Sequence, residues 1–280
     1  MGINVLSLFD GMSCGQLALN NAGIKYDNYF ASEIKKHAIE TTQHNFPNTI
    51  QLGDVHHIKA SQLPNIDLLI GGSPCQNLTY LNSKGRAGLE GEKSKLFYEY
   101  VRILNETKPT FFLLENVGSM KINDRNIITK IMGVEPIKFN SSIVSAQKRN
   151  RLYWTNIPLA GLPPDKGIVL EDIVDRNAPR EENWSNKKQA FVLRKNETMY
   201  VNIDGDKAIP VTARGYSAWN TQFVTNYDGM IRDLTLKEYK KLQTIPNWYH
   251  FPCIKSKATN LIGDGWTIDV IAHFLKGIVK

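Results

Sequence analysis

Two residues with reactive side chains follow neighbouring apolar runs of the sequence. Cys75 stands in the stretch GGSPCQNLT (71–79), directly after the run IDLLI, and Glu115 follows the run TFFLL. A cysteine in such a place can be a small buried hydrophobe, a metal ligand or a nucleophile. If the two residues lie close together, the acid could assist a nucleophilic thiol by hydrogen bonding or proton transfer to the substrate.

The spacing of the cysteines argues against metal binding. The chain holds three cysteines, Cys14, Cys75 and Cys253, and they form no CxxC pair. An odd number at wide spacing disfavours both a disulfide framework and a zinc site. We therefore expect no metal, and the choice for Cys75 narrows to burial or nucleophilic chemistry.

The elements that position these residues alternate between short apolar strands and amphipathic helices. We expect strands at 3–9, 26–32, 49–54, 66–72 and 110–117, helices at 13–23, 34–46, 94–108 and 125–134, and a closing hairpin from 140–146 and 151–157. Continuous apolar strands separated by helices are typical of a parallel sheet covered on both faces. The sequence predicts an α/β protein with a doubly wound, mostly parallel sheet.

The texture changes in the segment 160–226. It contains Pro163-Pro164, many Asn and Lys residues, and short alternating pieces such as AFVLRK (190–195), MYVNID (199–204) and AIPVTA (208–213). Alternation of this kind favours short strands. We expect a small, loop-rich β subdomain at 160–226, and a larger domain from 1–159 plus 227–280. In the larger domain, Thr235 and Glu238 predict a capping box for a helix at 234–243.

Further marked residues follow the first three expected strands, where ligands bind in a doubly wound sheet. The loop FDGMSCG (9–15) comes after the first strand, Glu33 after the second and Asp54 after the third. Each alone has an ordinary structural explanation, but two acids beside a glycine loop together indicate an adenosine-containing cofactor. The loop is neither GxxxxGK[ST] nor GxGxxG, so a cofactor without phosphate, such as S-adenosylmethionine, fits best.

Bulk properties limit the partners. The 280 residues carry a formal net charge of +7, which suits a polyanionic partner without requiring one. No apolar run approaches the roughly 20 residues of a membrane span, and no secretory signal is visible at the N-terminus. We expect no membrane association and an intracellular location.

Five segments, in order, resemble the motifs of the DNA cytosine-5 methyltransferases. FDGMSCG is similar to the cofactor loop of that family, GGSPCQNLT to its Pro-Cys motif, and LLENV to its Glu-Asn-Val motif. SAQKRNRLYW resembles the Gln-x-Arg-x-Arg motif, and RDLTLKEYKKLQTIP the late helix motif. The resemblance covers the chain apart from 160–226 and is strongest to the de novo type and to small phage or bacterial relatives.

The resemblance implies an S-adenosylmethionine-dependent methyltransferase fold and roles for individual residues. Cys75 would be the nucleophile, Glu115 would hydrogen-bond or protonate ring nitrogen 3, Arg151 would bind the cytosine oxygen, and Arg149 would position the catalytic loop or Glu115. The cofactor S-adenosyl-L-methionine, whose product is S-adenosyl-L-homocysteine, would contact Phe9, Asp10, Gly11, Met12, Cys14, Glu33, Ile34, Asp54, Val55, Pro74, Leu96, Asp264, Gly265 and Trp266. In the last three, GDGW replaces the family's usual Gly-Asn or Gly-Arg-Ser-Trp turn.

The implied partner is double-stranded DNA, from which the target cytosine would be flipped out of the helix. Predicted DNA contacts are Asn77, Ser83, Lys84, Arg86 and Arg214. The subdomain at 160–226 would read the target sequence, with 212–222 as the best candidate segment and Lys187, Lys188, Arg194 and Lys195 as further phosphate contacts.

Two other functions stay open at this point. One is RNA methylation, since one branch of the family acts on transfer RNA, although the Cys-Phe-Thr stretch of that branch is absent. The other is a catalytically inactive regulatory protein, against which the intact Cys75, Glu115 and arginine pair argue. The sequence does not indicate the recognition site, a restriction partner as opposed to a phage or orphan enzyme, a preference for hemimethylated DNA, or the oligomeric state.

Overall fold

The computed structural model describes residues 2–74, 89, 95–182 and 184–278. The chain divides into two compact units. The first comprises residues 1–139, 150–161 and 272–280, and the second comprises residues 140–149 and 162–271.

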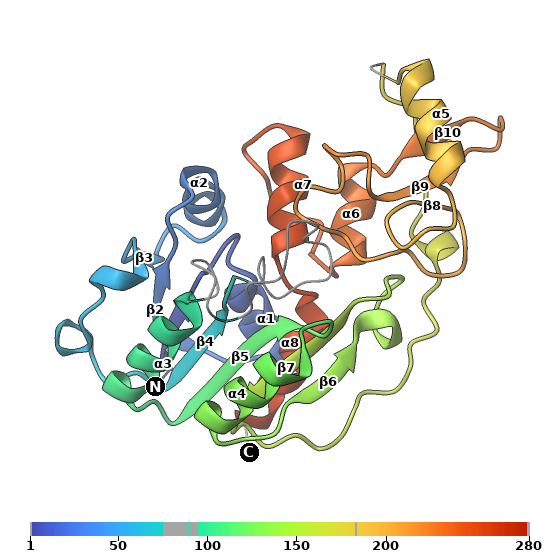
Figure 1. Cartoon of the computed structure of the whole chain (residues 1–280). Helices are drawn as coiled ribbons and strands as arrows, with labels where there is room; N and C mark the ends of the chain where they lie inside the picture. Colours follow the sequence, from blue (N-terminus) through green and yellow to red (C-terminus); the bar gives the residue numbers. More distant parts are fainter. Residues whose placement is uncertain (1, 75–88, 90–94, 183, 279–280) are drawn as a thin grey trace. The chain divides into compact units, whose positions relative to one another are not determined.

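The first unit is built on a seven-stranded sheet with the order β3-β2-β1-β4-β5-β7-β6 (Figure 1). The pairs from β3 to β5 are parallel, and β7 runs antiparallel to β5. This confirms the predicted doubly wound, mostly parallel sheet. The strands are β1 Ile3–Leu8, β2 Tyr26–Ser32, β3 Ile50–Gln51, β4 Leu68–Gly72, β5 Phe111–Val117, β6 Ile137–Asn140 and β7 Asn150–Thr155.

Helices cover both faces of this sheet. Helices α3 and α4 lie on one face and α1 on the other (Figure 1). On β5, Leu114 joins the core under α3 and α4, and the adjacent Leu113 points to the opposite face because side chains alternate along a strand. The helices are α1 Cys14–Ala22, α2 Lys36–Asn45, α3 Leu96–Thr107, α4 Ile122–Met132 and, continuing from the second unit, α8 Ile268–Leu275; the 3-10 turns are η1 Val55–His57, η2 Ala60–Gln62 and η6 Lys276–Ile278.

Close packing explains one glycine of the Gly-Gly pair that ends β4. A Cβ on Gly71 would lie 3.0 Å from the ring of Tyr100 in α3 and 3.1 Å from the backbone oxygen of Leu8 in β1. Tyr100 is fully buried. A side chain at position 71 would therefore push α3 away from the sheet just before the segment that contains Cys75.

The second unit holds a three-stranded sheet with the order β10-β9-β8. A separate small core of Val192, Val201, Phe223 and Ile231 supports it. The predicted capping box is present, since Thr235 accepts from the backbone of Glu238 and the Glu238 carboxylate accepts from the backbone of Thr235. The elements are α5 Asn186–Lys195, β8 Asn202–Ile203, β9 Gln222–Thr225, β10 Ile231–Asp233, α6 Leu236–Leu242, α7 Lys255–Asp264, and the 3-10 turns η4 Ser141–Ile143 and η5 Leu170–Asp172.

Three local expectations were wrong. The piece 190–195 belongs to helix α5, not to a strand, because Lys188 and Val192 bury one helical face at i and i+4 spacing. The segment 140–146 forms the turn η4, so the strand of that region is β6 at Ile137–Asn140. The piece 208–213 forms no strand and contributes only an isolated bridge from Ala208 to Gln147. Among the described helices, none is long and apolar enough to cross a bilayer.

Candidate active site

An ion pair joins two of the predicted catalytic residues at the carboxyl end of β5. Arg151 Nε lies 2.7 Å from Glu115 Oε1, and the two side chains are 16% and 11% exposed. The antiparallel register brings them together, because Val117 pairs with Arg151 and Glu115 with Tyr153 on the neighbouring strand β7. Both residues lie within strands, and the strand that contains Glu115 agrees with the one expected at 110–117. A buried carboxylate held by a guanidinium can present a fixed oxygen to a ligand.

Asn116 links the end of β5 to the end of β4. Its side-chain nitrogen donates to the backbone oxygen of Ser73 at 3.2 Å and to the Ser73 hydroxyl at 3.0 Å. Its side-chain oxygen accepts from the backbone of Val117 at 2.8 Å. Asn116 is 1% exposed and Ser73 is 4% exposed. The backbone that leads into Pro74 is therefore fixed by the strand that carries Glu115.

Pro74 is the last described residue before a gap. Five predicted site residues lie outside the described residues: Cys75, Asn77, Ser83, Lys84 and Arg86. Their predicted roles stay predictions.

The glycine loop after β1 has an unusual backbone. Phe9, Gly11 and Ser13 have positive φ angles of 59°, 60° and 60°. Only glycine adopts this left-handed region without strain, so the two non-glycine residues indicate that the loop is held by its surroundings. The predicted cofactor residues Met12 and Cys14 are buried within it.

Asp10 is a buried carboxyl group in the middle of this loop. The Tyr29 hydroxyl donates to its Oδ1 at 2.7 Å, and its Oδ2 is buried without a hydrogen-bond partner among the described residues. The pKa of Asp10 is raised from 3.8 to about 6. Burial raises it most, the hydroxyls of Ser7, Tyr29 and Ser13 lower it in part, and the charge of Glu33 adds a smaller rise. The sequence reasoning missed Tyr29, although a tyrosine inside a buried strand requires a polar partner.

Glu33 ties the first two strand ends together. Its Oε2 accepts from the backbone of Gly11 at 2.8 Å, and its Oε1 accepts from the backbones of Ile34 and Lys35 at 2.8 and 2.9 Å. The adjacent Ile34 is 71% exposed. Glu33 thus orders the glycine loop, and Ile34 offers an apolar surface next to it.

The remaining predicted cofactor residues of the first unit follow β3 and begin α3. Asp54 Oδ1 accepts from the backbone of His56 at 3.0 Å and lies 2.7 Å from its Nδ1. These hydrogen bonds lower the pKa of Asp54, which caps the turn η1. Val55 is buried and Leu96 packs partly buried against the same core.

In the second unit, Arg149 lies before β7 and not within it. Its guanidinium donates to the backbone oxygens of Val211, Gly263 and Gly265 at 2.6, 3.0 and 2.8 Å. Two of these carbonyls flank Asp264, an exposed residue at the end of α7, and the buried Trp266 follows. The predicted residues Arg149, Asp264, Gly265 and Trp266 therefore form one local structure.

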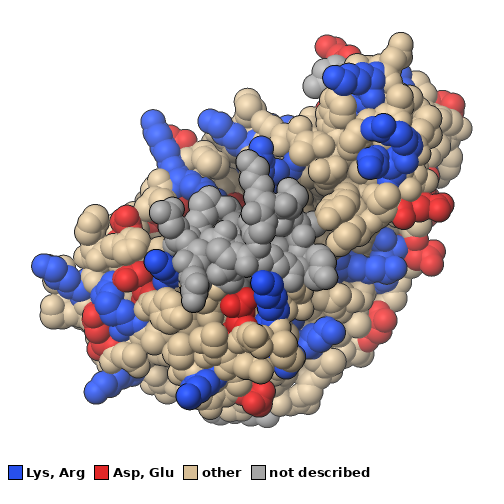
Figure 2. Space-filling model, in the orientation of Figure 1, with Lys and Arg blue, Asp and Glu red and all other residues tan. Residues whose placement is uncertain are grey.

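The residues expected to contact DNA from the second unit fall into two groups. Arg214, Lys187, Arg194 and Lys195 are exposed, and Figure 2 shows Lys and Arg side chains gathered over α5. Lys188 is different: it is 4% exposed, forms an ion pair with Asp233, and its nitrogen lies 4.7 Å from the centre of the Trp184 ring. The expectation that Lys188 contacts phosphate was wrong, because its ammonium group is buried and paired with Asp233 inside the second unit.

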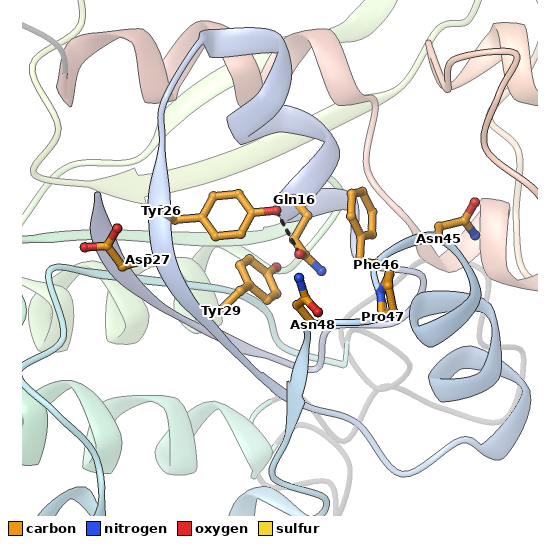
Figure 3. Close-up of a pocket in the computed structure, with 8 residues that line it drawn as sticks. All are labelled: Gln16, Tyr26, Asp27, Tyr29, Asn45, Phe46, Pro47 and Asn48. Carbon is orange, nitrogen blue, oxygen red and sulfur yellow. Dashed lines mark hydrogen bonds between the residues drawn. The ribbon is translucent and has the colours of Figure 1, made fainter. Parts of the chain in front are cut away.

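A hollow beside α1 contains none of the predicted site residues (Figure 3). The Tyr26 hydroxyl donates to Gln16 Oε1 at 2.9 Å, and the Gln16 nitrogen donates to the hydroxyls of Ser13 and Thr49, both at 2.8 Å. Because the Gln16 amide is engaged at both ends, we assign no ligand to this hollow. The described residues also contain no group of three or more His, Cys, Asp or Glu side chains that could hold a metal ion.

Fold and site together define a class. The fold is one shared with solved methyltransferases. Solved structures of DNMT2 from Spodoptera frugiperda and of the methyltransferase EhMeth from Entamoeba histolytica match it, each with a TM-score of 0.79. Their sequence identities are 18% and 16%, and the matches cover 99% or more of this chain and 98% or more of the other.

The family follows from the sequence matches. Residues 3–157 and 138–280 match the model of the C-5 cytosine-specific DNA methylases, and the chain belongs to this family. Similar relatives include the orphan methyltransferase M.Rho11sI of Bacillus phage rho11s, 37% identical over 68% of this chain and 40% of that protein. The orphan methyltransferase M.SPRI of Bacillus phage SPR is 31% identical over 72% of this chain and 45% of that protein. The chain thus spans less than half the length of these two relatives.

Proposed function

We propose that this protein transfers a methyl group from S-adenosyl-L-methionine to carbon 5 of a cytosine in double-stranded DNA. The observation that carries the proposal is the pairing of Glu115 with Arg151 on β5 and β7, beside the strand end that leads into Pro74 and Cys75. Asn116 joins the two strand ends by its hydrogen bonds to Ser73. A thiol, an acid and a guanidinium are the groups that cytosine activation needs.

The chemistry follows from the electron-poor ring of cytosine. The Cys75 thiolate would add to carbon 6, which makes carbon 5 nucleophilic. Glu115 would hydrogen-bond or protonate ring nitrogen 3 and so draw electrons as the sulfur adds. Arg151 would bind the cytosine oxygen while it holds Glu115 in place. Carbon 5 would then form a bond to the methyl group, and S-adenosyl-L-homocysteine would leave. A water or hydroxide would remove the carbon 5 proton, and elimination would release Cys75.

The residues of the first unit fit the cofactor. S-adenosyl-L-methionine is cationic, and Asp10 offers a buried carboxyl oxygen without a partner among the described residues. The exposed Ile34 offers an apolar surface for an adenine ring. When bound, the cofactor would supply an electrophilic methyl group on sulfur. Asp10 would face its positive charge, and Glu33 would keep the loop that contains Asp10 and Gly11 in shape.

The substrate would be reached by base flipping, because carbon 6 is inaccessible to a thiol inside a stacked duplex. We propose residues 160–226 as the target-recognition subdomain, with the exposed Arg214 as a contact, and Asn77, Ser83, Lys84 and Arg86 as contacts next to the nucleophile. Such an enzyme would act inside the cell, in the cytoplasm or nucleoid of a bacterium or a phage-infected cell. The similar proteins M.NgoBV of Neisseria gonorrhoeae and M1.ScrFI of Lactococcus lactis are named type II methyltransferases, so we propose that this enzyme protects DNA beside a restriction enzyme.

The test is a transfer assay with methyl-labelled S-adenosyl-L-methionine and either duplex DNA or RNA. We expect label in DNA, and bisulfite sequencing of that DNA would give the target sequence. Label in RNA alone would replace this proposal with RNA methylation. Label in neither polymer would leave a regulatory DNA-binding protein.

A variant at the nucleophile tests the mechanism. Cys75→Ser should lose methyl transfer and should also lose the covalent complex that wild-type protein forms with DNA containing 5-fluorocytosine. Transfer at the wild-type rate by Cys75→Ser would contradict the thiolate mechanism even if DNA is the substrate.

A further inference from the structure

We propose that Arg149 is a positioning residue that fixes the turn Gly263–Trp266 against the start of the segment 212–222, and that Gln147 and Gln243 complete this frame. The inference rests on the proposed function, because its consequence concerns cofactor and DNA binding. The family resemblance implied a different role for Arg149, at the catalytic loop or Glu115.

The first step is the geometry of the Arg149 guanidinium. Nη1 donates to Val211 at 2.6 Å, and Nη2 donates to both Gly263 and Gly265 at 3.0 and 2.8 Å. Arg149 is 4% exposed. A planar fork with donors fixed relative to one another sets the distances between three backbone carbonyls. A lysine ammonium on a flexible stem could reach some of them but would not hold them in one plane.

The second step is the pair of buried amides. Gln243 donates to Ile262 at 2.9 Å and to Gly265 at 3.3 Å, and its side-chain oxygen accepts from the Thr267 hydroxyl at 2.7 Å. Gln147 donates to that same oxygen at 3.2 Å. Both glutamines are fully buried. The turn is therefore held by hydrogen bonds on Ile262, Gly263, Gly265 and Thr267, around the predicted cofactor residues Asp264 and Trp266.

The third step is that Gln147 and Arg149 also bind the backbone of Val211. Its backbone nitrogen donates to Gln147 Oε1 at 2.7 Å and its oxygen accepts from Arg149. The next residues press on the turn, since a Cβ on Gly263 would lie 2.2 Å from the backbone of Thr212 and 2.4 Å from that of Ala213. A displaced turn would therefore displace the start of 212–222, and the reverse also holds.

The consequence is a coupling of two binding functions through one guanidinium. The turn contains Asp264, Gly265 and Trp266, which the family resemblance implies as contacts of S-adenosyl-L-methionine, and 212–222 contains Arg214, a proposed DNA contact. Loss of the Arg149 fork should weaken the binding of both. Loss of the Thr267 hydrogen bond should affect the turn alone, because Thr267 does not contact Val211 in any described hydrogen bond.

The experiment compares Arg149→Lys, Thr267→Val and the control Arg232→Lys in the full chain. Arg232 is also a fully buried arginine of the second unit, but it pairs with Glu238 and donates to none of the turn carbonyls in any described hydrogen bond. Binding of S-adenosyl-L-homocysteine is measured by calorimetry, steady-state kinetics give kcat and both KM values, and thermal unfolding gives stability.

We expect Arg149→Lys to raise the cofactor Kd about tenfold or more and to raise KM for DNA, with a smaller change in kcat. Thr267→Val should raise the cofactor Kd by about threefold and leave KM for DNA unchanged. This variant still tests the inference if Arg149→Lys does not fold. Arg232→Lys should lower the unfolding temperature and leave the cofactor Kd unchanged. Equal cofactor Kd values for wild-type and the two turn variants would overturn the inference, as would an equal rise in Arg232→Lys. A wild-type protein that neither binds cofactor nor transfers methyl would instead overturn the proposed function.

Discussion

Replacement of Asp10 by asparagine should make the cofactor-free protein more stable at neutral pH. Asp10 has a pKa near 6 in the folded chain, chiefly because it is buried, and 3.8 is its ordinary value. Glu33 is the charged neighbour that adds to the shift, and Tyr29, whose pKa lies well above 10, stays neutral. An asparagine has the same shape and its oxygen can still accept from the Tyr29 hydroxyl.

The sign and size follow from proton linkage. Below pH 3.8 the carboxyl is protonated in both the folded and the unfolded chain, so it carries no penalty. Between pH 3.8 and 6 the unfolded chain releases a proton that the folded chain keeps, and the free energy of unfolding falls as pH rises. Above pH 6 the full penalty applies. A shift of about two pKa units corresponds to about 3 kcal/mol.

The assay is urea unfolding of wild-type and Asp10→Asn at several pH values from 4 to 7.5. The other titrating groups contribute equally to both proteins, so the difference in unfolding free energy isolates residue 10. We expect this difference to shift in favour of the variant by up to about 3 kcal/mol across the range. A difference in unfolding free energy that stays constant with pH would refute the assignment of a raised pKa to the buried Asp10 carboxyl group.

Bound cofactor should favour the wild-type protein over Asp10→Asn in unfolding free energy. If Asp10 faces the cationic cofactor, Asp10→Asn loses that attraction at pH 7.5, and saturating S-adenosyl-L-methionine should stabilise wild-type protein more than the variant, because a ligand stabilises only the state that binds it. Equal stabilisation of both proteins by the cofactor would show that Asp10 does not contact its charge.

Three further changes have distinct expected outcomes. Glu115→Gln should lower kcat for methyl transfer by about 100-fold or more while the cofactor Kd stays unchanged, as a transfer assay and calorimetry would show. Asn116→Ala should cost about 1–3 kcal/mol in urea unfolding, because it leaves the buried Ser73 backbone oxygen without its side-chain donor, and should lower kcat more than it changes the cofactor Kd. Thr235→Ala removes the N-cap of α6 and should cost about 1 kcal/mol of stability with kcat unchanged, which would separate capping from catalysis.

Local patterns in the sequence were enough to predict the sheet and the strand ends at which several proposed site residues lie. The strands β1, β4 and β5 contain apolar runs, and helices separate successive strands, so a mostly parallel sheet follows from general rules of chain connection. The Thr235–Glu238 box was visible because capping acts within one turn of helix. Likewise, Glu33 and Gly11 were expected at neighbouring strand ends, and a hydrogen bond joins them.

The missed features depend on partners that are remote in the sequence. Alternation in 190–195 indicated a strand, although the segment lies in a helix. The burial of Lys188 at the start of that helix depends on its pairing with Asp233, 45 residues away, and nothing near Lys188 in the sequence shows this. The contacts of Arg149 span 62 to 116 residues. A basic residue has the same local pattern whether it faces solvent or closes a buried network, so only the fold separates the two.

This difference changes how the arginine motif is understood. In the sequence, Arg149 and Arg151 are two equivalent charges with one residue between them. In the structure, Arg151 pairs with a carboxylate that we propose acts on the base, whereas Arg149 donates to three backbone carbonyls of the second unit. A guanidinium is suited to both tasks because its donors are rigid and its charge is permanent. Lysine at position 151 would keep the charge beside Glu115, but lysine at position 149 would lose the geometry that the second unit uses.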